Sequence, residues 1–281
     1  MLITCWGARG SIPVSGKDYV EYGGDTTCME IRRENQDPVI IDAGSGIRRL
    51  GNRMLAERQG RFDMIFTHSH WDHLLGFPFF KPLYFKGTAI RMYGCPFAQK
   101  SIREMFAKTM SPPYFPVNLN DVKGSIEYNE TCDNDFSLGA IEVKATLLSH
   151  PNQGIGYKFM DTESGGSFVF LTDNEITYKH PGGLEYADYL DFCRGADLLI
   201  HDAEYMPEEY KLTRTWGHSV YTDVLDMAIG AGVKRLGLFH HNQERTDKQV
   251  DEMAANCVRI VKERGAGLEC FAVKVGQEME V

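Results

Sequence analysis

The side chains best suited to chemistry lie together in the segment THSHWDH, residues 67–73. His68, His70, Asp72 and His73 directly follow a short apolar run at 63–66. Imidazole nitrogens and carboxylate oxygens are ligands that zinc and other transition metals accept, and this spacing supplies donors for two adjacent ions when the segment forms a tight loop. A polar surface turn that is rich in histidine by chance is the alternative, which such a dense cluster of donors disfavours.

The elements that must position these side chains are short strands and a few helices. β-type runs occupy 2–6, 28–33, 38–42, 63–66, 89–93, 140–148, 155–159, 167–172, 197–201, 234–239 and 270–275. Helical patterns occupy 97–108, 219–231 and 246–264, with Thr246 as the predicted N-cap and Gly265 after the last turn. Most of the nine histidines directly follow a predicted strand, which is where α/β proteins build their sites. Strands mixed with helices predict an α/β sandwich.

Length and composition are those of a globular chain. The 281 residues contain no repeat and no linker long enough to divide them, so we expect a single domain over 1–281. The formal charge of -9 disfavours nonspecific binding to nucleic acid or to an anionic membrane. We expect no membrane span or signal peptide, and therefore a cytoplasmic location. Seven widely spaced cysteines predict reduced thiols rather than disulfides or a thiolate zinc site.

The motif H-x-H-x-D-H after a short apolar strand resembles the signature of the metallo-β-lactamase superfamily. The resemblance implies an α/β fold of the αββα four-layer sandwich type, in which the remaining metal ligands follow later strands in a set order. The chain offers them in that order: His150 after 140–148, Asp173 after 167–172 and His240 after 234–239.

Under this resemblance the ligands divide between two divalent metal ions. One ion takes three imidazoles, the second takes two imidazoles and a carboxylate, and a further carboxylate bridges both ions. In that order the residues are His68, His70 and His150, then Asp72, His73 and His240, then Asp173. Zinc fits such a set best, and manganese and iron also accept it.

Two later stretches resemble the phosphodiesterase branch of the superfamily, which includes tRNase Z and the phosphoribosyl cyclic phosphodiesterases. They are LLIHDAEY at 198–205 and the segment 216–241, in which GHS at 217–219 precedes a predicted helix. The resemblance implies that His218 is the general acid for the leaving oxygen and that Glu204 orients it. This chain has DAE at 202–204 where the family motif has Glu before Ala. A helix-terminal residue without chemistry is the alternative for His218.

Several other polar residues lie near the predicted site in sequence or in motif. The opening WGARGSIPVSG resembles a bacterial group of metal-dependent hydrolases, and its Arg9 either approaches a phosphate or is a solvated turn residue. His241 competes with His240 for one ligand position, and we expect it beside the ligands or facing the substrate. His180 is expected to be a solvated loop residue. Asp42 is expected to support the ligands or the fold.

One departure from tRNase Z bears on the substrate. tRNase Z inserts a long Gly/Pro-rich arm before the strand that leads to the bridging Asp, whereas here 155–159 and 167–172 are joined by MDTESGG. Together with the net charge, the missing arm predicts a small phosphodiester substrate and no tRNA. The aromatic segment 77–118 is expected to pack in the core, with a base-stacking lid or a dimer contact as alternatives. Family analogy predicts a homodimer.

These residues together predict a dinuclear metal-dependent phosphodiesterase that acts on a small nucleotide or sugar phosphodiester, cyclic ones included, through a metal-bound hydroxide. Asp72 would orient or deprotonate the nucleophile, and His218 would protonate the leaving oxygen. The alternatives are a thioester, lactone or β-lactam hydrolase and a metal-stabilised nucleotide-binding sensor without turnover. A di-iron redox role is disfavoured because that branch has Glu where His70 stands.

Overall fold

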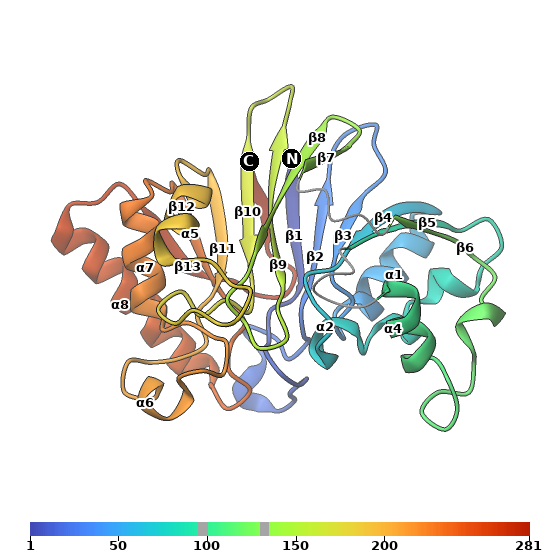
Figure 1. The fold of residues 1–281 in the computed structure, drawn as a ribbon, viewed down its shortest axis with the longest axis horizontal. Helices are drawn as coiled ribbons and strands as arrows, with labels where there is room; N and C mark the ends of the chain where they lie inside the picture. The colour runs from blue at the N-terminus through green and yellow to red at the C-terminus, as the bar shows by residue number, and fades with distance from the viewer. Residues whose placement is uncertain (95–100, 130–134) are drawn as a thin grey trace.

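The computed structural model describes residues 1–94, 101–129 and 135–281. These residues form two seven-stranded sheets that face each other, with helices on both outer sides (Figure 1). The first sheet has the order β14-β1-β2-β3-β4-β5-β6. Its strands are β1 (Leu2–Gly7), β2 (Cys28–Arg32), β3 (Val39–Ile41), β4 (Arg61–Ile65), β5 (Ala89–Tyr93), β6 (Ser125–Asn129) and β14 (Glu278–Glu280).

The second sheet has the order β13-β12-β11-β10-β9-β8-β7. Its strands are β7 (Asp135–Leu138), β8 (Ile141–Leu147), β9 (Ile155–Asp161), β10 (Ser167–Leu171), β11 (Leu198–Asp202), β12 (Arg235–Phe239) and β13 (Glu269–Ala272). Strands β10 to β13 run parallel to one another, while β7 to β10 pair antiparallel. The carboxyl ends of β10, β11 and β12 therefore lie at one edge of this sheet.

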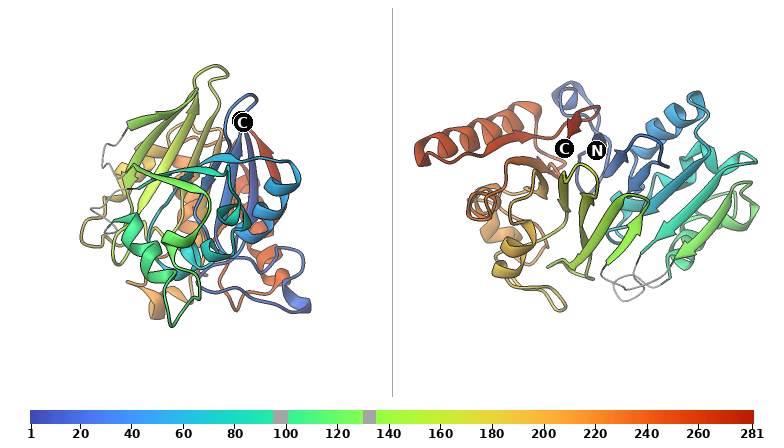
Figure 2. Two further views of the ribbon diagram at one scale, coloured as in Figure 1. Left: turned by 90° about the vertical axis from the view of Figure 1, so that its right-hand side faces the viewer. Right: turned by 90° about the horizontal axis from the view of Figure 1, so that it is seen from above.

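The helices divide between the two outer faces, as the view from above shows (Figure 2). The α-helices are α1 (Ile47–Ala56), α2 (Trp71–Leu74), α4 (Ile102–Thr109), α5 (Tyr186–Cys193), α6 (Tyr210–Thr213), α7 (Tyr221–Gly230) and α8 (Asp247–Arg264). Short 3-10 turns lie at Lys17–Tyr19, Phe77–Phe79, Lys81–Tyr84 and Leu119–Asp121. Helices α1 and α4 pack on the first sheet, and α5, α7 and α8 pack on the second.

Alternating side chains explain why the strands bury both of their faces. In β10, Phe168 and Phe170 point into the core between the sheets, while Val169 and Leu171 point toward the helices. All four side chains are fully buried. Since successive side chains in a strand point to opposite faces, one apolar run serves two cores. The result is an αββα four-layer sandwich, and the predicted fold class is confirmed.

Each predicted strand corresponds to a strand of the structure, and the predicted helix at 246–264 corresponds to α8. The hydroxyl of Thr246 accepts a hydrogen bond from the Gln249 amide, and Gly265 ends the helix with a φ of 62°. Sequence reasoning missed β6, β7 and β14, which are edge strands with few buried residues. Because few of their side chains are buried, the apolar pattern that indicates a strand in the sequence is weak.

Some expectations fall partly outside the described residues. The first four residues of the predicted helix 97–108 lie outside them, as do Cys95 and Cys132. The other five cysteines are buried and free. In segment 77–118, Phe77, Phe80 and Phe106 are fully buried in the core of the first sheet, as expected of core packing. Within the described ranges, none of the helices combines the length and apolar character that crossing a bilayer needs.

Candidate metal centre

The predicted ligands meet at the ends of strands from both sheets, and α2, which carries two of them, is labelled in Figure 1. His68 and His70 lie in the loop after β4, and Asp72 and His73 lie on α2. The remaining ligands each follow a strand of the second sheet: His150 after β8, Asp173 after β10 and His240 after β12. The loop and α2 bring donors from the first sheet to the strand ends of the second.

The structure brings the seven side chains into two groups that share one member. Ligand atoms within each group lie within 4.8 Å of one another. The first ligand group is His68, His70, His150 and Asp173, and the second ligand group is Asp72, His73, Asp173 and His240. All are buried except His70, which is half-buried and marks the side from which solvent reaches the centre.

Asp173 lies between the two groups with one carboxylate oxygen toward each. Its Oδ2 lies 3.4 Å from Nε2 of His68 and 3.9 Å from Nε2 of His150. Its Oδ1 lies 3.2 Å from Nε2 of His73 and 3.4 Å from Nε2 of His240. This arrangement suits a carboxylate that bridges two ions.

Unpaired buried nitrogens support the fit of a metal to these residues. Nε2 of His68 and Nε2 of His73 are buried and have no hydrogen-bond partner. A buried polar atom without a partner costs about 1–3 kcal/mol, so such atoms call for an explanation. Each nitrogen faces a different oxygen of Asp173, and a divalent cation in each ligand group would satisfy its nitrogen and that oxygen together.

In three of the imidazoles, the second ring nitrogen is held by an acceptor outside the two groups. Nδ1 of His73 donates to Asp42, 2.8 Å away, and Nδ1 of His240 donates to Glu204, 2.9 Å away. Nδ1 of His150 donates to the carbonyl of Gly217 at 2.9 Å. Such contacts fix the tautomer and leave Nε2 free to coordinate. Asp42 therefore supports a ligand.

Burial and charge act differently on the imidazoles of the two groups. Burial lowers the pKa of His68 and His70, and it lowers the pKa of His150 to about 3. These rings are neutral and present lone pairs, as a metal ligand must. Burial also opposes protonation of His73 and His240, but the neighbouring carboxylates outweigh it and raise the pKa of both. In the second ligand group a metal ion would replace those protons.

His218 lies beside the two ligand groups and contacts two carboxylates, that of Asp202 more closely than that of Glu204. Its Nδ1 is 2.8 Å from Oδ2 of Asp202 and 3.5 Å from Oε2 of Glu204. Its ring stacks on that of His240 with centroids 4.7 Å apart. Burial would lower the pKa of His218, but the charges of Glu204 and Asp202 outweigh it and raise that pKa to about 9.

Glu204, the partner that the resemblance implies for His218, lies within ion-pair distance of it but also contacts other groups. Glu204 is closer to His240, and its other oxygen accepts a hydrogen bond from Asn242 at 2.8 Å. Asp202 is the last residue of β11, which pairs with β12, the strand before His240. From this position its carboxylate lies closer to His218 than the carboxylate of Glu204 does. The local order of DAE at 202–204 does not reveal which carboxylate faces which ring.

Glu175 is a buried residue of the site region that sequence reasoning missed. Its carboxylate accepts hydrogen bonds from the amides of Thr215 and Gly217 at 2.8 and 2.9 Å. It also pairs with His180, 2.7 Å away, so His180 is buried rather than solvated as expected. Gly217 requires glycine here, because it has a φ of 94° and a Cβ would lie 2.0 Å from Nδ1 of His150. Glu175 thus anchors the loop that carries His218.

Two further expectations differ from the structure. Arg9 is fully buried, and its guanidinium donates to the carbonyls of Gly23, Asn242 and Arg245, so it is neither solvated nor directed at a substrate. His241 is also buried and donates from Nε2 to the Val273 carbonyl at 2.8 Å, which turns it away from the ligand groups. Both side chains stabilise the scaffold behind the centre.

Three residues of the centre have a left-handed backbone. Asp42, Asp173 and His240 have φ values of 60°, 56° and 57°, and each follows a buried strand. This conformation costs about 1–2 kcal/mol for a residue with a side chain, and Asn, Asp and His adopt it more readily than others. The turn of the backbone points each side chain back across the sheet edge toward the cluster.

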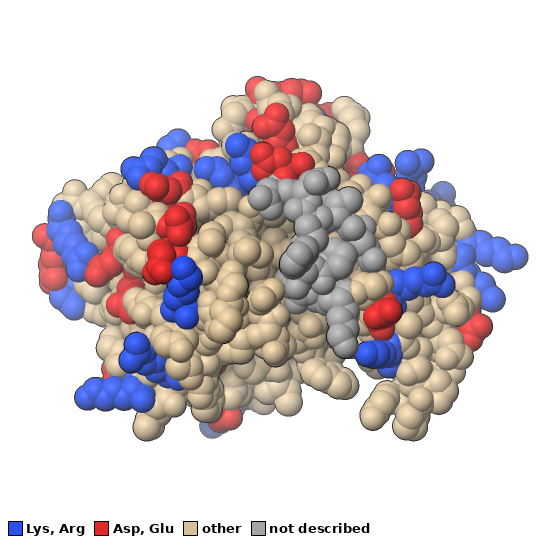
Figure 3. Space-filling model, viewed as in Figure 1, with Lys and Arg blue, Asp and Glu red and all other residues tan. Residues whose placement is uncertain are grey.

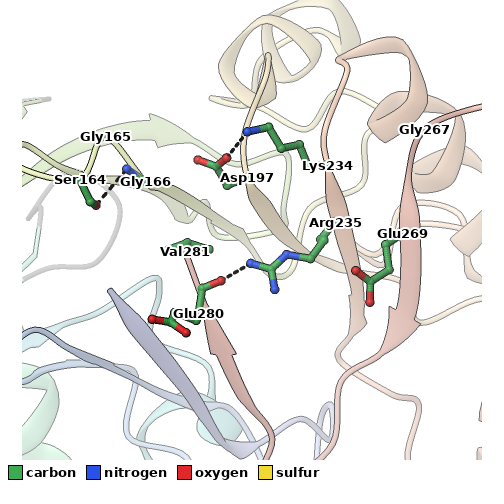
Figure 4. Close-up of a pocket in the computed structure, with 10 residues that line it drawn as sticks. All are labelled: Ser164, Gly165, Gly166, Asp197, Lys234, Arg235, Gly267, Glu269, Glu280 and Val281. Atoms are coloured by element: carbon green, nitrogen blue, oxygen red, sulfur yellow. Dashed lines mark hydrogen bonds and ion pairs between the residues drawn. The ribbon is translucent and has the colours of Figure 1, made fainter.

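A separate surface pocket of about 740 Å³ lies at the opposite ends of the parallel strands. It is lined by the starts of β12 and β13, the β9–β10 turn and the end of β14 (Figure 4). Lys234 pairs with Asp197 at 2.6 Å, and Arg235 donates to the Glu280 carbonyl. None of the seven predicted ligands lines this pocket, so chemistry is expected at the ligand groups instead.

A model of a known protein family matches most of the chain. Residues 38–241 match the model of the beta-lactamase superfamily domain, which is more than half of the chain, and the chain therefore belongs to this superfamily. The family predicted from H-x-H-x-D-H is confirmed.

Curated relatives with similar sequences have ribonuclease names. The protein "Ribonuclease Z" of Haloarcula marismortui is 22% identical over 300 residues, which cover 90% of each chain. The protein of the same name from Sulfurisphaera tokodaii is 26% identical over 257 residues, covering 82% of this chain and 86% of that one. These names agree with the predicted phosphodiesterase branch and with a metal-dependent hydrolase.

Solved structures share the fold at low sequence identity. The metallo-beta-lactamase fold protein YhfI from Bacillus subtilis has a TM-score of 0.72 at 17% identity, covering 100% of this chain and 98% of that one. A diphosphatase from the PhnP family has a TM-score of 0.67 at 18% identity, covering 100% and 97%. Human tRNase Z, short form, has a TM-score of 0.67 at 19% identity, covering 100% and 99%.

The expectation that excluded tRNA as a substrate is wrong. Relatives named ribonuclease Z align over most of their length, and human tRNase Z, short form, matches the entire chain in fold. Net charge misled the inference because it sums over the whole chain, whereas binding depends on the charges beside the site. On the face shown in Figure 3, acidic and basic side chains are interspersed. The predicted homodimer and cytoplasmic location stay predictions.

Proposed function

We propose that the chain is a dinuclear metal-dependent phosphodiesterase, with His218 as its general acid. The observation that carries this proposal is the contact between Asp202 and His218 beside the two ligand groups. A cationic imidazole held there matches the need to protonate a poor leaving oxygen. Thioester, lactone and β-lactam hydrolysis share the metal ligands but give no comparable role to a held imidazolium.

The proposed metal ions belong to the two ligand groups, with Asp173 shared, and zinc is the ion that these donors fit best. When bound, a pair of divalent ions supplies Lewis-acid stabilisation of a phosphoryl group and an acidified water at neutral pH. Nε2 of His68, His73, His150 and His240, Nδ1 of His70, and the carboxylates of Asp72 and Asp173 would hold them.

The chain's own side chains then manage the protons. Asp72 accepts a hydrogen bond from the Ser11 amide at 2.9 Å, which fixes its carboxylate so that it can orient the attacking nucleophile. Nδ1 of His218 is occupied by Asp202, so Nε2 carries the proton that passes to the departing oxygen. Asp202 and His218 are both buried, which excludes competing water from this proton transfer.

Two kinds of phosphodiester are candidate substrates. A small nucleotide or sugar diester, cyclic ones included, fits a centre that opens at the half-buried His70. RNA, including tRNA, is supported by the names of the relatives. In both, the departing group is a sugar oxygen, which His218 would protonate.

The test is hydrolysis of bis(p-nitrophenyl) phosphate by protein loaded with zinc or manganese, followed by 2′,3′- and 3′,5′-cyclic nucleotides and a tRNA precursor. We expect turnover that disappears with chelator and returns with metal. Turnover of lactone or thioester substrates alone would overturn the proposal. The same holds if two ions are bound and no phosphodiester in the panel is cleaved.

A further inference from the structure

We infer that Trp71 and Trp216 are a nucleobase-binding pair at the mouth of the candidate metal centre. This inference rests on the proposed function and narrows its candidate substrates to phosphodiesters that carry a base. Trp71 is 72% exposed and Trp216 is 62% exposed, although tryptophan is usually well covered in a folded protein.

Both indoles belong to segments that hold the centre together. Trp71 directly follows His70, and Trp216 directly precedes Gly217. Nδ1 of His70 lies 3.1 Å from Nε2 of His150, and Nδ1 of His150 donates to the Gly217 carbonyl at 2.9 Å. Contacts through His70 and His150 therefore connect the two segments that carry the tryptophans, and His70 is the half-buried member of the ligand groups.

Local geometry directs the Trp71 ring outward. Trp71 is the first residue of α2, while Asp72 and His73 on the same helix are buried in the second ligand group. Its carbonyl accepts a hydrogen bond from the Leu75 amide at 2.7 Å, so the backbone beneath the ring is fixed. The exposed ring is a consequence of turning its two neighbours inward.

The backbone of Trp216 is fixed as well. The amides on both sides of it, at Thr215 and Gly217, donate to the buried carboxylate of Glu175. Its own amide donates to the Thr213 carbonyl at 3.0 Å. An exposed aromatic ring on an anchored loop loses little freedom when it binds a flat ligand, and this preorganisation favours binding.

Nucleobases are the flat groups that accompany a phosphodiester. Every base offers a π-face, and stacking on an aromatic side chain needs no specific hydrogen bond. Isolated exposed apolar residues are common on proteins, but two of the three tryptophans of this chain flank one ligand cluster. Trp6, the third, is half-buried and donates to Glu30 at 2.9 Å, away from the centre.

The first experiment measures binding without turnover. Dissociation constants of AMP and of ribose 5-phosphate are measured by calorimetry on the metal-loaded protein, since both ligands present a phosphate and only AMP has a base. We expect AMP to bind more tightly, and Trp71→Ala or Trp216→Ala to weaken AMP about tenfold relative to ribose 5-phosphate. Trp71→Phe and Trp216→Phe should recover part of the loss, because a smaller ring still stacks.

The second experiment compares two substrates with the same leaving group, the p-nitrophenyl ester of thymidine 5′-monophosphate and methyl p-nitrophenyl phosphate. We expect either alanine variant to lower the ratio of their kcat/KM values about tenfold, mainly through KM. Val258→Ala, an exposed apolar residue on α8, is the matched control and should leave the ratio unchanged.

The two proposals fail separately. If AMP and ribose 5-phosphate bind equally, or if the alanine variants weaken both alike, the nucleobase-binding pair is overturned whatever the enzyme hydrolyses. If the wild-type protein cleaves neither ester, the phosphodiesterase proposal fails, and the AMP comparison still decides whether the tryptophans bind a base.

Discussion

Oδ2 of Asp202 lies 2.8 Å from Nδ1 of His218 across a gap of sixteen residues, and both side chains are buried. The Asp202 carboxylate also accepts hydrogen bonds from the backbone amides of Asn174 and Glu204. These bonds fix its position independently of the His218 ring. A fixed carboxylate behind an imidazole keeps one tautomer and stabilises the protonated form.

His218→Ala is expected to lower kcat by about 10²–10⁴ for a diester with a poor leaving group, because no group then protonates the departing oxygen. The loss should be much smaller for a p-nitrophenyl ester, whose leaving group needs little protonation. Kinetics on the two substrate types and metal analysis of the variant provide the test. Equal losses on both would argue against an acid role, provided that both ions are retained.

Asp173→Ala is expected to lose metal rather than only activity. Its two oxygens face different ligand groups, so the substitution removes one donor from each. We expect the metal content of purified protein to fall from two ions per chain to fewer than one, measured by plasma mass spectrometry. Asp226→Ala, at a half-exposed side chain on α7, is the control and should keep both ions.

Glu204→Gln is expected to weaken metal binding about 10–100-fold, since the carboxylate orients the His240 ring through Nδ1. Competition with a chromophoric chelator measures the affinity. Glu208→Gln makes the same chemical change at an exposed position and should have no effect. Unchanged affinity in Glu204→Gln would assign Glu204 to His218 alone, as the sequence first indicated.

Removal of metal is expected to destabilise the fold as a whole, because the ligands come from both sheets. An ion present at 100 times its dissociation constant stabilises the native state by about 2.7 kcal/mol. We expect chelator to lower the Tm by at least about 5 °C, and zinc to restore it. Scanning calorimetry measures the Tm. A Tm that is the same with and without chelator would show that these residues bind no structural ion.

Acid should weaken a second connection between the sheets. Asp161 on β9 accepts from Arg33 at 3.2 Å and from the amides of Glu163 and Ser164. Burial raises the pKa of Asp161, but these partners outweigh it and lower that pKa. A lowered folded-state pKa adds stability above the unfolded value of about 3.9, and that stability is lost as pH falls through the folded-state pKa. The Tm difference between wild type and Asp161→Asn should therefore shrink between pH 5 and pH 2.

The clustering of the candidate ligands could be predicted from sequence because metal chemistry restricts residue type and strand ends restrict position. His150 and Asp173 were recognisable once the family was, since each follows an apolar run. The partners behind the ligands were not predictable in the same way. Asp202, Glu204 and Glu175 differ in which ring or amide they reach, and only packing between strands decides that.

Sequence reasoning also failed to predict which polar side chains are buried. Arg9 and His180 lie in Gly-rich or Pro-rich segments that look like surface turns, yet both are buried. Each is satisfied by groups distant in the chain, the Arg245 carbonyl for Arg9, for example. Local composition carries no record of such partners, which explains both errors.

The left-handed backbone at Asp173 and His240 has an evolutionary consequence. A substitution at either position must adopt the left-handed backbone as well as supply a donor to the ion. Few side chains tolerate that backbone conformation. His70 lies in ordinary extended backbone, with φ and ψ of -67° and 155°, and carries no such restriction. Among the candidate ligands, the backbone therefore restricts substitution at position 70 less than at positions 173 and 240.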